Sequence, residues 1–392
     1  MKKVYLMIYD LGGGHRSTAN ALQKIIEKRN LPWEIHIVDA FKEIIGMTAP
    51  QDVYNNLILK KNWAKIISEP LLVPLFKLQI RLWHFAWLAR FKKYWQQHQP
   101  DIVVSLLPYI NRLLYESLQA VSPNIPFVTL PIDFVDCPPN FWIESQKQFL
   151  ICPTEQMVEQ AQKLGYKKEQ IYPISGMVIN PQIYEHITVN RQVERQRLGL
   201  EPNLPTALIM FGGYGSNAMI EIAQCLEQSS LKIQLIFICG RNEKLANILR
   251  HSQSRLPRYV ENFTNEIPYY MYLSDFFIGK PGPGSLSEAV AMKLPVITEC
   301  NALTLFQERA STQWLVNHEF GIVVDHFRDI KTAVAELIQP ENLARYRSNV
   351  AAYKNRAVFE VADILESIIK NPFSSVTLSP NVDICNQLSS TV

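Results

Sequence analysis

Apolar runs and amphipathic runs alternate along the first half of the chain. Val4–Asp10 predicts a β-strand, Ser17–Lys28 has the spacing of an amphipathic helix, and Glu34–Asp39 predicts a second strand. This order predicts a βαβ unit, in which the strands are parallel and the helix covers one face of the sheet. Ile102–Leu106 and Phe127–Ile132 predict further strands of the same sheet.

The same alternation returns in the second half of the chain. The predicted strands are Thr206–Phe211, Leu235–Cys239, Phe276–Ile278 and Val296–Thr298. The predicted helices are Ala218–Gln228, Arg241–Arg250 and Ser285–Met292, with a long terminal helix over Ala352–Ile369. We therefore expect a second parallel sheet, although the two halves are not a sequence repeat.

The expected fold class is α/β, with two Rossmann-like domains that face a cleft. The join is placed near Pro181–Arg191, which gives an N-terminal domain over 1–185 and a C-terminal domain over 186–352. A helix over 353–370 and a loose tail over 371–392, rich in Ser, Asn, Pro and Thr, complete the chain. Active sites of such domain pairs lie at the carboxyl ends of the strands.

Composition narrows the class of protein. Of the 392 residues, 47% are apolar, which suits a globular core, and the net charge of +3 gives no general signature of nucleic-acid binding. No nucleic-acid partner is expected. The cysteines form no CxxC pair and lie near no histidine at zinc-ligand spacing; they are Cys137, Cys152, Cys225, Cys239, Cys300 and Cys385. We interpret them as reduced thiols of a cytoplasmic protein that has no metal site.

The N-terminus does not read as a targeting segment. Met1–Asp10 contains two lysines and a short apolar run, but glycines follow it, so we predict a strand and not a signal peptide. No uninterrupted apolar stretch reaches the roughly 18–20 residues that a membrane span needs.

Three glycines, Gly12 to Gly14, followed by His15, connect the first predicted strand to the first helix. Glycine permits a tight turn with positive φ, and a helix N-terminus there offers free N–H groups to an anion or an acceptor oxygen. The positive end of the helix dipole also favours neutral imidazole, so His15 is a candidate general base in the cleft. A tight turn that carries a surface histidine is the alternative interpretation.

Lys280–Glu288, with the sequence KPGPGSLSE, is the most specific motif. Its glycine turn opens a predicted helix, so the N–H groups of Gly284, Ser285 and Leu286 are placed to hold a diphosphate. The Glu288 carboxylate, one turn further, is placed to accept from both hydroxyls of a ribose. A capping box of Ser285 and Glu288 uses the same spacing and is the alternative.

A third glycine loop follows the first predicted strand of the second half. It runs over Gly212–Ser216 and contains Gly213 and Tyr214. The loop is neither a Walker loop nor the GxGxxG fingerprint, so by itself it is weak evidence for phosphate binding.

The segment 52–95 combines positive charge with large aromatic side chains. Its basic residues are Lys60, Lys61, Lys65, Lys77, Arg81, Arg90, Lys92 and Lys93, against only Asp52 and Glu69. Its aromatic residues include Trp63, Phe76, Trp83, Phe85, Trp87, Phe91 and Trp95. Such a surface suits the headgroup region of an anionic membrane, so peripheral membrane contact is expected. A core-packed helix pair with solvated lysines is the alternative.

Asp133 closes the predicted strand that begins at Phe127, and the sequence CPPNFW follows over 137–142. A carboxylate at the end of a strand faces the cleft, where Asp133 would orient His15 or be the base itself. An aspartate that only caps a turn fits the pattern equally well.

Together these motifs resemble the monogalactosyldiacylglycerol synthase branch of inverting glycosyltransferases, which is itself similar to the peptidoglycan N-acetylglucosaminyltransferase. The matching stretches are GGGHR (12–16), DIVVSLLP (101–108), ID with CPPNFW (132–142), ICPTEQ (151–156), ICGRNEKL (238–245), KPGPGSLSEA (280–289), FQE (306–308) and RAVFEV (356–361). They follow the family order over nearly the whole chain. The resemblance implies a glycosyltransferase-B fold and transfer of a hexose from a UDP-sugar to a lipid such as diacylglycerol.

The resemblance also implies how the donor is held, with no cofactor and no required divalent metal. Glu288 would grip the ribose, and the turn from Gly282 to Ser285 would hold the diphosphate. The backbone near Phe263 and Thr264 would meet uracil.

Further roles follow from the same resemblance. Gln307 and Glu308 would read sugar hydroxyls, and His15 would deprotonate the acceptor for a single displacement with inversion. The terminal helix over 353–370 would cross back onto the N-terminal domain.

The chain departs from the family pattern at three positions. Asn180 stands where an arginine is usual, so Lys280 or Arg241 is expected to supply the cation near the diphosphate. Tyr214 replaces a glycine of the diphosphate loop, and Ser311 replaces a frequent asparagine.

Three alternatives to this function stay open. The chain could be a UDP-sugar 2-epimerase-like enzyme of the same fold, although the basic, tryptophan-rich segment argues against it. It could transfer sugar to another hydrophobic acceptor, or be an inactive nucleotide-sugar-binding protein, for which Asn180 and Tyr214 are the support.

Overall fold

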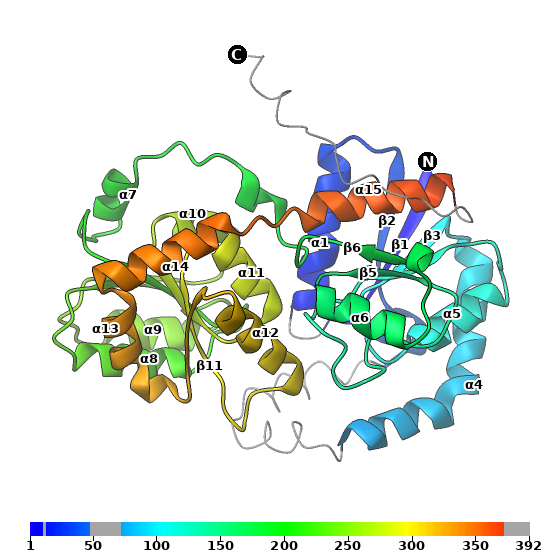
Figure 1. The fold of residues 1–392 in the computed structure, drawn as a ribbon, viewed down its shortest axis with the longest axis horizontal. Coiled ribbons are helices and arrows are strands. Elements are labelled where there is room, and N and C mark those ends of the chain that lie inside the picture. Colours follow the sequence, from blue (N-terminus) through cyan, green and yellow to red (C-terminus); the bar gives the residue numbers. More distant parts are fainter. Residues whose placement is uncertain (11–12, 48–71, 372–392) are drawn as a thin grey trace.

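The chain folds into two α/β domains that lie side by side (Figure 1). The computed structural model describes residues 1–10, 13–47 and 72–371, without the side chains of 72–77 and 79. Much of the basic segment, including Lys60, Trp63 and Lys65, therefore lies outside the described residues, as does the predicted tail.

The N-terminal domain is built on a parallel sheet of six strands in the order β2-β1-β3-β4-β5-β6. The strands are β1 (Lys2–Ile8), β2 (Trp33–Asp39), β3 (Ile102–Ser105), β4 (Phe127–Thr129), β5 (Phe149–Cys152) and β6 (Ile171–Pro173). In the register, Val4 of β1 lies beside Ile35 of β2 and Ile102 of β3. Strands this apolar suit a sheet that is covered on both faces.

Successive residues of β1 serve opposite faces of this sheet. Val4 and Leu6 pack in the core beneath α1 (Gly14–Lys28) and α15 (Ala357–Lys370), whereas Tyr5 and Met7 pack beneath α4 (Leu72–His98) and α5 (Asn111–Gln119). The helices and helical turns of the domain are α1 (Gly14–Lys28), a π-helical turn η1 (Ala40–Ile45), α4 (Leu72–His98), α5 (Asn111–Gln119), α6 (Glu155–Lys163), and the short turns η2 (Lys168–Gln170) and η3 (Pro181–Tyr184).

Helix α4 divides the aromatic residues of segment 52–95 between the core and the surface. Trp87, Phe91 and Trp95 are buried in the core, and the Trp95 indole donates to Ser117 Oγ at 2.9 Å. Trp83 and Phe85, by contrast, are 54% and 81% exposed. Trp87, Phe91 and Trp95 are therefore core residues, and the expectation that they face a membrane is wrong.

The C-terminal domain repeats the architecture with the strand order β12-β11-β10-β7-β8-β9. The strands are β7 (Thr206–Met210), β8 (Gln234–Ile238), β9 (Arg258–Glu261), β10 (Phe276–Gly279), β11 (Val296–Glu299) and β12 (Gly321–Val324). All neighbouring strands are parallel. Together with the first sheet, this confirms the predicted pair of Rossmann-like domains.

Helices cover both faces of the second sheet. They are α7 (Arg191–Arg197), α8 (Ala218–Glu227), α9 (Glu243–His251), α10 (Ile267–Tyr272), α11 (Pro283–Ala291), α12 (Phe306–Asn317), α13 (Ile330–Leu337) and α14 (Pro340–Ala352), with a 3-10 turn η4 (Phe327–Asp329). Ala207 and Ile209 of β7 pack on the side of α8, α9 and α13, and Leu208 packs on the side of α11 and α12.

Two segments of the chain join the domains. The first connects β6 to β7 and contains the predicted join, and the second lies between α14 and α15 (Ala357–Lys370). The predicted continuous helix from Ala352 is thus interrupted over 353–356, where Tyr353 donates to the Ser175 carbonyl and Asn355 to the Met177 carbonyl. Figure 1 shows α15 lying on the N-terminal domain beside α1.

Phe134 and Trp314 stack across the domain junction with their ring centroids 4.6 Å apart. Both side chains are buried, so the domains share apolar surface as well as two covalent connections.

No helix in the described ranges combines the length and apolar character that a bilayer span requires.

The contrast between two tryptophans of α4 generates a stability prediction. Trp87→Ala should destabilise the protein by about 3–5 kcal/mol, because it removes a buried aromatic side chain and leaves a cavity. Trp83→Ala is the matched control and should change the stability little, since that side chain is already half exposed. Thermal unfolding followed by circular dichroism measures both, and equal shifts in the midpoint would contradict this packing of α4.

Candidate functional site

Each sheet has one position where the chain reverses the direction in which it adds strands. In the N-terminal domain it lies between β1 and β3, and in the C-terminal domain between β7 and β10. Ligands of doubly wound sheets bind at the carboxyl ends of the strands at these positions. The segments that follow β1, β7 and β10 contain His15, Gly213, Tyr214 and the motif from Lys280 to Glu288.

His15 lies at the reversal point of the N-terminal sheet. Helix α1 begins at Gly14, earlier than predicted, and Gly13 precedes it with a φ of +86°, a conformation that favours glycine. His15 is therefore in the first helical turn, and its Nδ1 lies 2.5 Å from the Leu106 carbonyl oxygen, just beyond the end of β3. Since a carbonyl only accepts, Nδ1 carries the proton and Nε2 keeps a free lone pair.

Burial lowers the pKa of His15 to about 4. The Leu106 carbonyl and the carboxylates of Asp10 and Asp39 act in the opposite direction but do not compensate. The imidazole is therefore neutral at physiological pH, which is the form that accepts a proton.

Asp133 is held by a tryptophan and not by His15. The Trp142 indole Nε1 donates to Asp133 Oδ2 at 2.9 Å, and the Trp142 ring centroid lies 6.3 Å from that of His15. The hypothesis that Asp133 orients the His15 ring is thus wrong for this structure, because the Leu106 carbonyl has that position.

The pKa of Asp133 also shows that the two domains face one another at this site. Burial raises it to about 7, and the Trp142 hydrogen bond lowers it in part. Glu308 raises it further and Lys280 lowers it, although both residues belong to the C-terminal domain. The carboxyl ends of the two sheets are therefore close enough for their charges to interact.

Three loops of the C-terminal domain converge at the carboxyl end of its sheet. The Arg241 N–H donates to the Gly213 carbonyl at 2.8 Å, which ties the loop after β8 to the loop after β7. At Gly240 a Cβ would lie 2.3 Å from the same carbonyl oxygen, so only glycine fits there. Lys280, directly after β10, lies near Gly212 and pairs with Glu308 across 3.2 Å.

Helix α11 begins at Pro283, and Gly282 is its N-cap residue. Ser285 is consequently inside the helix, where its hydroxyl donates to the Gly282 carbonyl, so the alternative of a Ser285–Glu288 capping box is wrong. The Leu286 N–H bonds to the Gly282 carbonyl and is not available to a ligand. This leaves the N–H groups of Gly284 and Ser285 at the helix N-terminus for an anion.

Glu288 lies one turn into α11 and reaches the segment that joins the domains. It accepts a hydrogen bond from the Asn180 backbone N–H, while burial raises its pKa to about 7. The Asn180 side chain is used locally, accepting from the Gln182 N–H at 3.2 Å. The residue that replaces the usual arginine therefore contributes its backbone to the site.

Arg241 lies over two aromatic rings, with its guanidinium carbon 4.3 Å from the Phe263 centroid and 5.9 Å from that of Tyr214. Both rings are more than 40% exposed, so this cluster is an open rim beside the glycine loops. Thr264 follows Phe263, and its hydroxyl accepts from the Glu266 N–H. Gln307, beside Glu308, has a buried Oε1 with no partner among the described residues.

The structure thus brings the donor residues predicted from the sequence to one edge of the C-terminal sheet and His15 and Asp133 to the facing edge. Sequence reasoning missed Leu106, Trp142 and the Asn180 N–H. Leu106 ends a predicted strand and Trp142 lies in a matching motif, but backbone acceptors and indole donors carry no signal of their own in a sequence. In the described ranges, no three His, Cys, Asp or Glu side chains gather as metal ligands.

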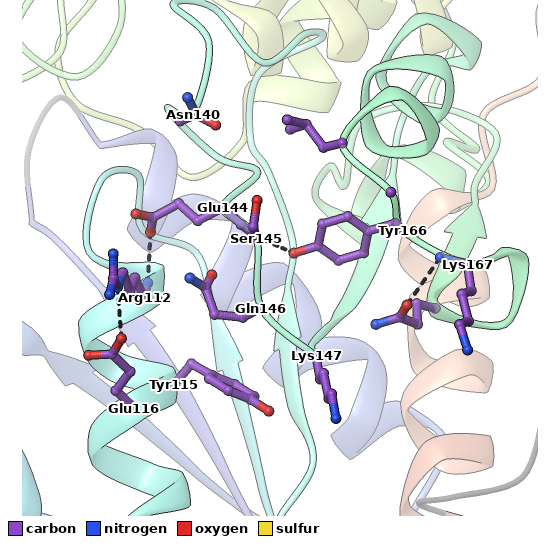
Figure 2. Close-up of a pocket in the computed structure, with 13 residues that line it drawn as sticks. Arg112, Tyr115, Glu116, Asn140, Glu144, Ser145, Gln146, Lys147, Tyr166 and Lys167 are labelled. Atoms are coloured by element: carbon purple, nitrogen blue, oxygen red, sulfur yellow. Dashed lines mark hydrogen bonds and ion pairs between the residues drawn. The ribbon is translucent and has the colours of Figure 1, made fainter.

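A separate hollow of about 870 Å³ lies in the N-terminal domain (Figure 2). Its walls include Arg112, Glu116, Glu144 and Tyr166. The Arg112 guanidinium pairs with the Glu116 carboxylate, and the backbone N–H of Arg112 donates to the Glu144 carboxylate. The Tyr166 hydroxyl donates to the Glu144 carbonyl. These polar groups bond to one another, and none of the predicted site residues lines this hollow.

Known proteins similar to the chain agree with the motifs. Residues 15–179 match the family model of monogalactosyldiacylglycerol (MGDG) synthase. The probable MGDG synthase 2 of rice is 25% identical over 405 residues, covering 97% of this chain and 83% of that protein. MGDG synthase 1 of Arabidopsis thaliana is 25% identical and covers 96% and 73%. The predicted resemblance to this family is confirmed.

Solved structures show the same architecture. MurG of Acinetobacter baumannii superposes with a TM-score of 0.61 at 14% identity, covering 94% of this chain and all of that chain. Anabaena HepE in complex with UDP-glucose superposes with a TM-score of 0.56 at 13% identity, with 94% and 100% coverage. These likenesses confirm the predicted glycosyltransferase-B fold.

Proposed function

We propose that this chain, a glycosyltransferase similar to the MGDG synthases, transfers a hexose from a UDP-sugar to a lipid hydroxyl such as that of diacylglycerol, with inversion at the anomeric carbon. The observation that carries the proposal is the position of His15, whose free Nε2 belongs to the N-terminal edge of the site while the donor loops belong to the other domain. A base and a leaving group on opposite sides of a sugar suit a single displacement.

In the proposed reaction, His15 Nε2 takes the proton of the acceptor hydroxyl. The acceptor oxygen bonds to the anomeric carbon as the bond from that carbon to the diphosphate oxygen breaks. UDP leaves with the electron pair, and the Gly284 and Ser285 N–H groups together with Lys280 face its charge. The negative diphosphate also favours imidazolium, which offsets the low pKa that burial gives the free His15.

The donor is proposed to lie along the loops after β7, β8 and β10. Glu288 would bind the ribose, and Arg241 with Phe263 and Tyr214 would line the nucleotide side. Arg241 and Lys280 would supply the charge that an arginine at position 180 would give. Gln307, whose Oε1 has no described protein partner, would accept from a sugar hydroxyl beside Glu308.

We further propose that α4 contacts an anionic membrane. Leu78, Leu82 and Phe85 recur at the i, i+4, i+7 spacing of one helix face and are 51%, 73% and 81% exposed. Lys92 and Lys93 follow on the same helix. Arg90 does not add to this surface, because its guanidinium donates to the Ile45 carbonyl.

Glu288→Gln should weaken UDP binding by about 1.5–3 kcal/mol, because a charge-assisted acceptor for the ribose is lost. In the wild type, UDP affinity should fall as the pH drops through about 7, since Glu288 then takes up a proton and its pKa is raised to that value. Isothermal titration of the wild type and of Glu288→Gln between pH 6 and 8 checks this. The ionisation of UDP itself affects both proteins equally, so the difference between their pH dependences reports on Glu288. Equal affinities and slopes would remove Glu288 from the donor site.

His15→Ala should lower kcat at saturating donor by about 10²–10⁴ and leave UDP affinity within about twofold. The reason is that the imidazole serves the acceptor side, whereas the donor motifs all lie in the other domain. Transfer from UDP-sugars to diacylglycerol in mixed micelles, with UDP titration alongside, measures both. Asp133→Asn is the control, and near-normal turnover of His15→Ala with loss of turnover in Asp133→Asn would make the carboxylate the base.

The double substitution Leu82→Ser, Phe85→Ser should weaken the salt-resistant part of binding to anionic vesicles. Lys92→Gln with Lys93→Gln should weaken the salt-sensitive part by about 1 kcal/mol per charge. Ile248→Ser, which changes an exposed apolar residue of the other domain, is the matched control and should bind as the wild type does. Equal sedimentation of all variants with the vesicles would exclude α4 as the contact.

A further inference from the structure

A second hollow, of about 340 Å³, lies at the opposite edge of the C-terminal sheet from the donor loops. It is formed where α7 and α14 meet the amino ends of β7 and β10. Three arginines, Arg191, Arg195 and Arg347, line it together with one carboxylate, that of Asp275. The size is in the range of small-molecule pockets.

The Asp275 carboxylate is fully occupied by the protein. Its Oδ1 accepts from Arg191 Nη2 at 3.1 Å and from Arg347 Nη2 at 2.6 Å. Its Oδ2 accepts from Arg195 Nη2 at 2.7 Å and from the Thr206 N–H at 2.9 Å. Three guanidinium groups therefore share one negative charge, which leaves two positive charges without a partner in the walls of the hollow.

Arg195 is a structural member of this cluster. Its side chain is 3% exposed, and its remaining donors bond to the carbonyls of Leu273, Pro202 and Leu204. The charge and the donors of Arg195 are thus used inside the fold, where they fix α7 to the edge of the sheet.

Arg191 and Arg347 are different. Their side chains are 33% and 45% exposed, and their described hydrogen bonds use only Nη2 of each guanidinium. Arg191 Nε is shielded from solvent and has no acceptor in the described part of the chain. A shielded donor without an acceptor is costly, and it signals a group that is completed by something other than this fold.

We propose that this hollow binds an anion of the phosphate class, held between the guanidinium groups of Arg191 and Arg347. Guanidinium forks match the tetrahedral oxygens of a phosphate in bidentate geometry, and the uncompensated charge favours a dianion. Gln192 and Asn203 add amide groups to the wall. The proposal does not depend on the donor site, from which β7 and β10 separate it.

The position of the two arginines gives such a ligand a structural consequence. Arg191 is the first residue of α7, within the first connection between the domains, and Arg347 lies in the last helix before the second connection. An anion that both arginines bind would hold together the ends of the two connections that lie in the C-terminal domain.

Inorganic pyrophosphate is the probe, and isothermal titration measures its affinity for the full chain. Arg347→Gln should weaken binding about tenfold or more, because a charge-assisted bond is lost without loss of the buried Arg195–Asp275 pair. Arg345→Gln is the matched control, since it makes the same charge change on an exposed residue of the same helix that does not line the hollow. Arg191→Gln should behave as Arg347→Gln does.

Lys280→Gln separates this site from the proposed donor site. Pyrophosphate binding that survives Lys280→Gln and is lost in Arg347→Gln supports the hollow, whereas the reverse pattern assigns the binding to the donor loops and overturns the proposal. Equal affinity of Arg347→Gln and Arg345→Gln also overturns it. Competition by soluble dioctanoyl phosphatidate would identify a lipid headgroup as the source of the phosphate, and competition by inorganic phosphate alone would identify a free anion.

Discussion

In both domains the first strand lies inside its sheet, and this constraint determines where the site is built. Parallel strands require each connection to pass over a face of the sheet. Where the chain adds strands first on one side of the first strand and then on the other, the loops after two neighbouring strands lead to opposite faces of the sheet and leave a crevice between them. His15 meets the Leu106 carbonyl at that position in the first sheet, and Lys280 lies beside the glycine loop at that position in the second. The helix N-termini that open onto these loops supply the remaining polar groups.

Closure of the two sheets against each other has an electrostatic consequence. Burial lowers the pKa of His15 to about 4 and raises the pKa values of Asp133 and Glu288 to about 7. For all three groups, removal from water thus favours the uncharged form over the charged form. The free site therefore holds less charge near neutral pH than its composition suggests.

Patterns that depend on local geometry could be predicted from the sequence. The glycine turn before His15 and the turn before α11 were found because strand, glycine and helix follow one another within a few residues. The spacing of Ser285 and Glu288 does not reveal where the helix begins. The same residues fit a helix that Ser285 caps and a helix that begins at Pro283, and only the structure distinguishes the two. The burial of Trp87 beside the exposed Trp83 was not predictable either, because it depends on how α4 docks onto α5 and β1. Hydrogen bonds from backbone groups, such as the Asn180 N–H to Glu288, leave no trace in residue types.

The two connections between the domains also bear on how the domains move. Tyr353 and Asn355 of the second connection bond to the carbonyls of Ser175 and Met177 in the first, so the connections form one strip and not two independent tethers. A pair of bodies joined along one strip rotates about it, and displacement grows with distance from that axis. Glu288 contacts Asn180 on the strip and would move little in such a rotation, whereas His15 belongs to the other domain. Such a rotation would change the distance between His15 at one sheet edge and the loop after β10 at the other.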